Sequence, residues 1–470
     1  MGRQKILVVT VLEDTQFTGK RVHFVGIGGI SMSGLALMLQ QAGALVSGSD
    51  WHLNAITDRL AAAGATLYEG HAAEHVGDAE LVVYTAAASA DNPELVEARR
   101  RGIPVWERAK LLGALMKRVP HSIGVAGTHG KTTTSSMVAT IFVKAGRDPS
   151  IHLGAELPLI GGNARPGQGD VFITEACEYK DSFLSFPPTV AVLLNIDRDH
   201  LDYFHDLDHI ERSFAKYVSL LPREGLAIGF GDDERVCRVL AGAPCPTSRY
   251  GYGPHCEWRI AGAETDAAGY PRFVLHHAQY GAVPVQLGIP GLHNCLNAAA
   301  AIATAAHFGI DPRAAAAWVG EYAGASRRFQ RQGTLNGAPV IHDYAHHPTE
   351  VRATIAAVRP MTRGRVWCVF QPHTYTRTRL LFPELVEALA TADRVILPDI
   401  YAAREPDDGL IHSAQVAQAL AERGCDAQYE PDFDRICARL RAELQPGDTL
   451  LVLGAGDIVK LCDRLGCAEK

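Results

Sequence analysis

The segment best suited to chemistry is a glycine-rich stretch in the first third of the 470-residue chain. It reads Gly-Thr-His-Gly-Lys-Thr-Thr from Gly127 to Thr133. Glycines let the backbone curl so that several N–H groups face a phosphate, and the positive end of a following helix adds to the attraction. Lys131 could reach the β- and γ-phosphates of a nucleotide, and Thr132 could place its hydroxyl on Mg²⁺. Val125 stands where the Walker pattern has its first glycine, so the strict pattern is not met.

Two polar side chains near the ends of expected strands could supply metal ligands beside this loop. Glu175 follows an expected strand at residues 171–174, and His200 follows one at residues 190–195. In an open parallel sheet, ligands gather at the carboxyl ends of the strands. A carboxylate and an imidazole there could hold one or two Mg²⁺ together with water. We therefore expect Thr132, Glu175 and His200 to surround the metal.

A second glycine loop follows an expected strand at residues 21–25. Its spacing resembles the dinucleotide-binding fingerprint but departs from it at one position, because Ser31 stands where the third glycine belongs. Such a turn lets a diphosphate lie over amides at a helix start, which suits a UDP-sugar as well as NAD. The stretch around Ser89 could bind the same ligand or could simply cap a helix that begins at Pro93. The candidate UDP-sugar residues are Gly26, Gly28, Gly29, Ser31, Asp50 and Ser89.

Both loops read as strand, glycine turn and helix, which is the start of a doubly wound parallel sheet. A third unit of alternating strands and helices begins near residue 327, and residues 251–287 resemble an antiparallel insertion. The length of the chain also favours several domains. We expect an α/β protein with three domains. These are a Rossmann-like domain at 1–118, a P-loop-type ATPase with a mixed sheet at 119–326, and a C-terminal Rossmann-like domain at 327–470.

Composition narrows the class of protein. The net charge of −7 gives no general affinity for nucleic acid or for an anionic membrane. No apolar run reaches about 18 residues, and Glu13 and Asp14 interrupt the apolar N-terminus, so we expect neither a membrane span nor a signal peptide. Ten cysteines without a Cys-x-x-Cys pair indicate reduced, mostly buried thiols. The expected location is the cytoplasm.

Eight motifs, in order, resemble those of the Mur ligase family. They are VHFVGIGGISMSG, AGTHGKTTT, EACE, NIDRDH, PGLHNCLNAAAA, RRF, DYAHHPTE and QPHTYTRTR. The longer form EACEYKDSFL is similar to Gram-positive-type members. The resemblance implies an ATP- and Mg²⁺-dependent ligase of peptidoglycan synthesis. Such a ligase joins L-alanine to the carboxylate of UDP-N-acetylmuramate through an acyl phosphate, and we expect a monomer or weak dimer.

The resemblance also implies roles for individual residues. Lys131 is the phosphate lysine, and Arg327 lies near the γ-phosphate. His346 and Arg377 belong to the amino-acid site, which completes the catalytic set. Within the ATP site, two asparagines correspond to adenine-side residues and an aspartate to the residue that touches the ribose. The implied ATP-binding set is Gly127, Thr128, His129, Gly130, Lys131, Thr132, Thr133, Asn294, Asn297 and Asp343.

Several alternatives stay open at this point. A murein-tripeptide recycling ligase shares the phosphate loop and the HHPT motif, but the Thr-Arg-Thr-Arg run after Gln-Pro-His favours an amino-acid-adding enzyme. An NAD-dependent oxidoreductase leaves Lys131 unexplained. A nucleotide-gated binding protein without turnover leaves Glu175 and His200 unexplained as well. Glycine could replace L-alanine as the acceptor, and either His200 or His346 could deprotonate the amine.

Overall fold

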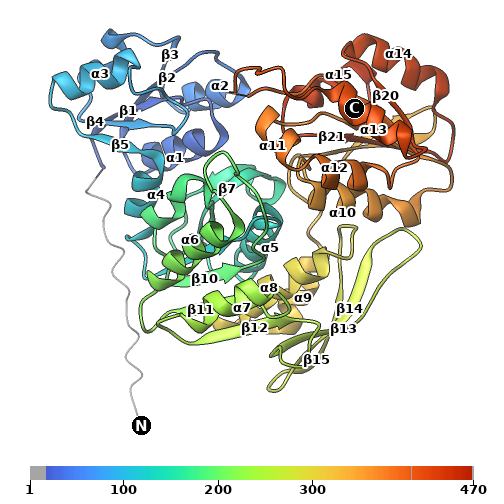
Figure 1. The fold of residues 1–470 in the computed structure, drawn as a ribbon. Helices are drawn as coiled ribbons and strands as arrows, with labels where there is room; N and C mark the ends of the chain where they lie inside the picture. Colours follow the sequence, from blue (N-terminus) through green and yellow to red (C-terminus); the bar gives the residue numbers. More distant parts are fainter. Residues whose placement is uncertain (1–16, 404, 468–470) are drawn as a thin grey trace. The chain divides into compact units, whose positions relative to one another are not determined.

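The computed structural model describes residues 17–403 and 405–467 (Figure 1). Residues 1–16, where the sequence predicts no signal peptide, lie outside these ranges. Backbone contacts divide the chain into two compact units. Unit 1 comprises Met1–Ser122 and Gly146–Thr174, and unit 2 comprises Ile123–Ala145 and Glu175–Lys470. Within the described ranges, no helix is both long and apolar enough to cross a bilayer.

The first sheet belongs to unit 1 and is wholly parallel, in the order β3-β2-β1-β4-β5. Its central strand β1 is buried from Val22 to Val25, and the glycine turn that leads into α1 follows at its carboxyl end. The strands are β1 Arg21–Val25, β2 Leu45–Asp50, β3 Thr66–Glu69, β4 Leu81–Tyr84 and β5 Val105–Glu107. The helices are α1 Ile30–Gln41, α2 Ala55–Ala62, η1 Ala73–Val76, α3 Pro93–Arg100 and α4 Arg108–Met116.

The second sheet has ten strands in the order β15-β14-β13-β12-β11-β10-β6-β9-β7-β8. Strand β10 is parallel to β6 and β11, whereas β13, β14 and β15 are antiparallel, which confirms the predicted insertion. The strands are β6 His121–Ala126, β7 Ser150–Leu157, β8 Gly162–Arg165, β9 Val171–Ala176, β10 Val190–Leu193, β11 Leu226–Phe230, β12 Thr247–Gly251, β13 Trp258–Thr265, β14 Pro271–His277 and β15 Gly281–Gln286. The helices are α5 Lys131–Lys144, η2 Pro158–Ile160, η3 Tyr179–Ser185, α6 Leu207–Ser219, α7 Glu234–Ala241, α8 Asn294–His307 and α9 Pro312–Gly320.

The third sheet has the order β16-β17-β21-β18-β19-β20, parallel except for β16. Alternate residues of β18 enter two separate apolar cores, with Val366 and Cys368 in one and Trp367 and Val369 in the other. Both faces are therefore covered, as in doubly wound folds. The strands are β16 Gln330–Leu335, β17 Ala338–Asp343, β18 Val366–Phe370, β19 Arg394–Leu397, β20 Asp426–Tyr429 and β21 Thr449–Leu453. The helices are α10 Pro348–Val358, η4 Arg359–Met361, α11 Tyr375–Leu380, α12 Phe382–Leu389, α13 Ser413–Glu422, α14 Phe433–Glu443, η5 Asp457–Val459 and α15 Lys460–Leu465.

These three sheets confirm the predicted three-domain α/β fold. The ten cysteines are free, and most of them are buried, as the composition predicted.

One crowded glycine in β6 generates a test of this packing. A Cβ built on Gly124 would lie 2.1 Å from the Tyr217 hydroxyl. Tyr217 is fully buried and stacks on Phe183 at 4.5 Å, so its ring has little room to move. We expect Gly124→Ala to lower the free energy of unfolding by about 1–3 kcal/mol, measured from urea midpoints. Gly162→Ala in β8 is the control, because nothing lies within 4 Å of its Cβ. Equal losses in the two variants would contradict the packing account.

Candidate active site

The phosphate loop connects β6 to α5 through a backbone turn that requires glycine. Gly130 is the N-cap of α5 and has a φ of +84°, in the left-handed region. A Cβ there would lie 2.7 Å from Asn297 Oδ1, so a larger residue would also clash. The helix begins at Lys131, directly after this left-handed residue. Lys131 and Thr132 are thereby fixed in the first helical turn.

Lys131 is held by a buried carboxylate that sequence reasoning missed. Its Nζ lies 3.0 Å from Glu178 Oε2 and donates to the Thr128 carbonyl at 3.1 Å. Burial disfavours the charged ammonium, but attraction to Glu178 outweighs burial and holds the pKa of Lys131 above its usual value. Glu178 comes just after β9 and is only 2% exposed. The only sequence signal for it was its spacing of three residues from Glu175.

The structure brings two of the three predicted metal ligands into direct contact. Thr132 Oγ1 donates to Glu175 Oε2 at 3.0 Å. The third, His200, has its Nε2 3.9 Å from Glu178 Oε1. The same oxygen accepts a hydrogen bond from Lys131 Nζ, so Glu178 lies close to both residues. Hydroxyl and carboxylate oxygens are ligands that Mg²⁺ prefers, so Thr132 and Glu175 fit this ion, and the His200 imidazole could join them together with water.

Of the two adjacent arginines, Arg328 is the one beside the phosphate loop. Its Nη2 donates to Thr132 Oγ1 at 3.2 Å. Arg327, the residue that the resemblance implied, instead has its Nη2 3.2 Å from the carbonyl oxygens of Ala455 and Gly456. Arg327 also has a φ of +61°, so the chain turns sharply between the two side chains. A doublet of like residues in the sequence gave no means of choosing between them.

A cavity of about 350 Å³ next to the phosphate loop has the size of a small-molecule site. Its wall is largely apolar but includes two buried carboxamides, where Asn297 Nδ2 donates to Asn294 Oδ1 at 2.9 Å. Asp343 also lines it and accepts hydrogen bonds from the N–H groups of Phe329 and Ala345. Burial raises the pKa of Asp343 to about 6. The sequence-predicted asparagines and aspartate therefore meet at one cavity that could enclose a nucleoside.

A second cavity, of about 340 Å³, contains Arg377 and His200 in its wall. Arg377 Nη2 lies 2.7 Å from Asp199 Oδ1. Burial would raise the pKa of Asp199, but Arg377 outweighs burial and holds it well below the usual range. His346 packs against His373 from outside this wall, and its Nδ1 lies 3.0 Å from the Tyr344 carbonyl. Burial lowers the pKa of His346 to about 4, so its imidazole is neutral at pH 7.

The N-terminal glycine loop in unit 1 is organised by Asp50. Gly28 N–H donates to Asp50 Oδ2 at 2.8 Å, and Gly26 has a φ of +82°. Gly29 is the N-cap of α1, which begins at Ile30. The three predicted glycines and Asp50 thus lie at one turn at the start of a helix, a position at which the helix dipole favours an anion.

Two further predicted residues in unit 1 lie in different surroundings. Ser31 Oγ accepts from Arg108 Nη1 at 3.0 Å and lies 3.1 Å from His152 Nε2. Neither partner was singled out in the sequence, because they are 77 and 121 residues away. Ser89 precedes the cap of α3, where its carbonyl accepts from Asn92 N–H at 3.1 Å. The stretch around Ser89 therefore contains a helix cap, at Asn92, which the sequence predicted as the alternative to a ligand site.

Comparison with known proteins matches almost the whole chain. Three family models match in succession: "Mur ligase family, catalytic domain" at residues 21–119, "Mur ligase middle domain" at 125–305 and "Mur ligase, glutamate ligase domain" at 327–456. The chain is 45% identical to the UDP-N-acetylmuramate–L-alanine ligase of Acetivibrio thermocellus, over 96% of each protein. It is 44% identical to the enzyme of that name in Clostridium beijerinckii, over 94% of this chain and 96% of the relative.

Comparison with solved structures also matches almost the whole chain. The UDP-N-acetylmuramate-alanine ligase of Thermotoga maritima superposes with a TM-score of 0.81 at 26% identity, covering 95% of this chain and 98% of the other. A murein peptide ligase from Psychrobacter arcticus gives a TM-score of 0.74 at 25% identity, with the same coverage. The phosphate loop, the acidic strand end and the two cavities thus occur in a chain whose three sheets are matched by three successive family models, and this chain belongs to the Mur ligase family.

Proposed function

We propose that this chain is a ligase that uses ATP to join L-alanine to the carboxylate of UDP-N-acetylmuramate, in peptidoglycan synthesis. The observation that carries the proposal is the meeting of Lys131, Thr132 and Glu175 at the loop beside a nucleoside-sized cavity. Relatives named for this reaction, at 45% and 44% identity over nearly the whole chain, support the choice of substrates. NAD chemistry would leave this loop without a role.

The reaction needs an activated carboxylate, because direct attack by an amine would have to expel an oxide. The γ-phosphoryl group of ATP moves to a carboxylate oxygen of UDP-N-acetylmuramate, giving an acyl phosphate and ADP. The amine of L-alanine then attacks the acyl carbon, the C–O bond to phosphate breaks, and the ammonium proton passes to a base. Catalysis of both steps depends on positioning and on stabilising negative charge.

The residues around the loop match these needs. Lys131 and Arg328 would face the phosphate charge, and Glu178 positions the Lys131 ammonium. Thr132, Glu175 and His200 would hold magnesium, which neutralises part of the charge on the phosphates when bound.

The remaining sites divide among three segments. Adenine would lie against Asn294 and Asn297 in the first cavity, with the ribose near Asp343. The carboxylate of L-alanine would face Arg377. His346, whose neutral imidazole packs against His373 in the wall of the same cavity, is the candidate base, since His200 is needed at the metal. The UDP-sugar would occupy the N-terminal glycine loop.

The family-model ranges support domain boundaries near residues 118 and 326.

A phosphate-release assay with different acceptors tests the proposed function. We expect release from ATP to require both UDP-N-acetylmuramate and L-alanine. Release with UDP-N-acetylmuramate and L-Ala-γ-D-Glu-meso-diaminopimelate, but not with L-alanine, would instead identify a recycling ligase. Turnover with no combination of substrates would refute an ATP-dependent ligase.

Substitution of the phosphate lysine should separate the two nucleotide sites. We expect Lys131→Ala to reduce ligation to the detection limit and to leave UDP-N-acetylmuramate binding unchanged, because Lys131 lies outside unit 1, which holds the N-terminal glycine loop. Steady-state kinetics and calorimetric titration measure the two properties. Lys144→Ala at the far end of α5, where the side chain pairs with Glu321, is the matched control and should retain activity. Loss of UDP-sugar binding in Lys131→Ala would contradict the assignment.

The two arginines make a second test. We expect Arg328→Ala to lower kcat by about 100-fold, because removal of one charge-stabilising donor has effects of that size. Arg327→Ala should act mainly on stability, since its guanidinium is bound to the carbonyls that follow β21. Measurement of kcat and of the unfolding midpoint for both variants decides. A larger fall in kcat for Arg327→Ala would restore the role that the resemblance implied.

A further inference from the structure

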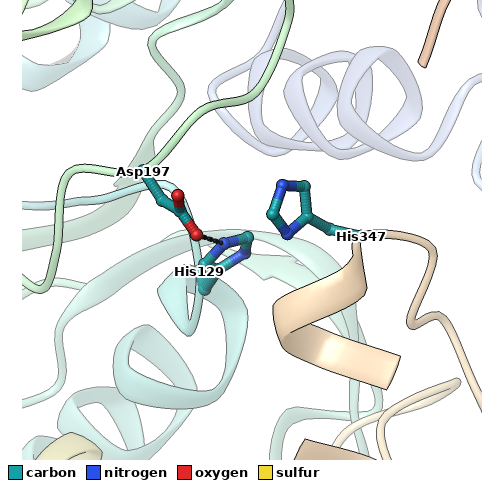
Figure 2. Close-up of side chains that lie close together, drawn as sticks. All are labelled: His129, Asp197 and His347. Carbon is teal, nitrogen blue, oxygen red and sulfur yellow. Dashed lines mark hydrogen bonds and ion pairs between the residues drawn. The ribbon is translucent and has the colours of Figure 1, made fainter. Parts of the chain in front are cut away.

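Three side chains from distant parts of unit 2 converge beside the phosphate loop (Figure 2). His129 belongs to the loop, Asp197 follows β10, and His347 is the N-cap of α10. His129 Nε2 lies 3.0 Å from Asp197 Oδ2, and its ring centroid lies 4.5 Å from that of His347. A fourth residue, Glu350 in the first turn of α10, completes the cluster, with its Oε1 3.2 Å from His129 Nδ1.

The geometry requires that His129 carry a positive charge. Each ring nitrogen faces a carboxylate oxygen, and a carboxylate can only accept, so both nitrogens must donate. Burial alone would lower the pKa of His129, but the hydrogen bonds to Asp197 and Glu350 raise it to about 9. The imidazolium thus connects the two carboxylates, one from each side.

The cluster is an ion network rather than a metal site. The ligand atoms of His129, Asp197 and His347 lie within 4.8 Å of one another, which is close enough for a cation. Both nitrogens of His347 are engaged, however. Its Nε2 lies 2.8 Å from the Arg198 carbonyl, and its Nδ1 accepts from Thr349 N–H at 3.2 Å. A metal ion bound here would have to break the cap that the His347 side chain gives to α10. It would also lie beside the positively charged imidazolium of His129.

Glu350 has two functions, one for each carboxylate oxygen. Its Oε2 accepts from the N–H groups of His346 and His347, at 3.2 and 3.3 Å, and so closes the capping box of α10. Its Oε1 faces His129. One carboxylate therefore joins the start of α10 to the phosphate loop.

The His129 side chain is not needed to shape the loop itself. The backbone at His129 is already held on both sides by Asn195, whose Oδ1 accepts from His129 N–H at 2.8 Å and whose Nδ2 donates to the His129 carbonyl at 3.1 Å. The imidazolium is thus available to bind a segment that lies more than 200 residues further along the chain.

We propose that His129 is a positioning residue whose imidazolium, held between Asp197 and Glu350, fastens the start of α10 to the phosphate loop. Fastening holds Asp343, at the end of β17, in the wall of the nucleotide cavity, and with it the turn from Asp343 to α10 that carries His346. The inference rests on the proposed function, because the step that it assists is ATP-dependent ligation.

The test uses four variants of the full chain. His129→Gln and Glu350→Gln each remove one charge, and glutamine is also suited to the N3 position of a capping box, so α10 should still form. The double variant measures their coupling. Glu387→Gln is the control, since it makes the same charge change in an exposed ion pair with Arg352.

Kinetics and hydrogen exchange are both measured. We expect each single variant to lower kcat by about tenfold, with the KM for ATP nearly unchanged, as removal of one charged hydrogen bond predicts. The double variant should lose no more than either single variant, because the two residues form one contact. With a non-hydrolysable ATP analogue bound, amides in the first turns of α10 should exchange faster in both single variants and at the wild-type rate in Glu387→Gln.

Several results would overturn the proposal. They are wild-type kcat and exchange in Glu350→Gln, multiplied losses in the double variant, or a rise in the KM for ATP alone, which would make His129 a nucleotide contact. If the wild-type chain shows no turnover with any acceptor, the proposed ligation fails. The exchange rates of α10 then still decide whether the contact exists.

Discussion

The buried ion pair between Lys131 and Glu178 is the interaction on which the rest of the site depends. An ammonium taken out of water is costly unless a carboxylate compensates for it, and Glu178 does so from the end of β9. Lys131 lies in the first turn of α5 and Glu178 follows β9, so the pair forms only when these two elements are correctly placed relative to each other. The first turn of α5 is thereby placed, and with it Thr132 and its contacts to Glu175 and Arg328.

The same rule applies to the other buried charges of unit 2. Arg377 is paired with Asp199, and His129 with Asp197 and Glu350. In each case the cation and its partner come from elements far apart in the sequence, so none of these charges is compensated before the chain has folded. The buried charges of the site are therefore compensated only when the tertiary structure has formed. An isolated helix or loop of this chain could not hold its charged groups out of water.

Much of the fold could be predicted, because strands with apolar runs and glycine turns leave strong local signals. The antiparallel insertion at residues 251–287 and the alternating strands and helices after residue 327 were predicted for that reason. Individual contacts were less accessible. Glu178 could not be distinguished from a solvated acid, and Arg327 could not be distinguished from Arg328, because a turn with positive φ decides which side chain faces the loop.

The turn at Gly130 has a consequence for nucleotide recognition. Its backbone packs so closely on the Asn297 carboxamide that not even a methyl group would fit between them. The amides at the phosphate end and the carboxamides at the nucleoside end are therefore in van der Waals contact through a single glycine. A side chain at residue 130 would therefore disturb the nucleoside end of the cavity as well as the phosphate loop.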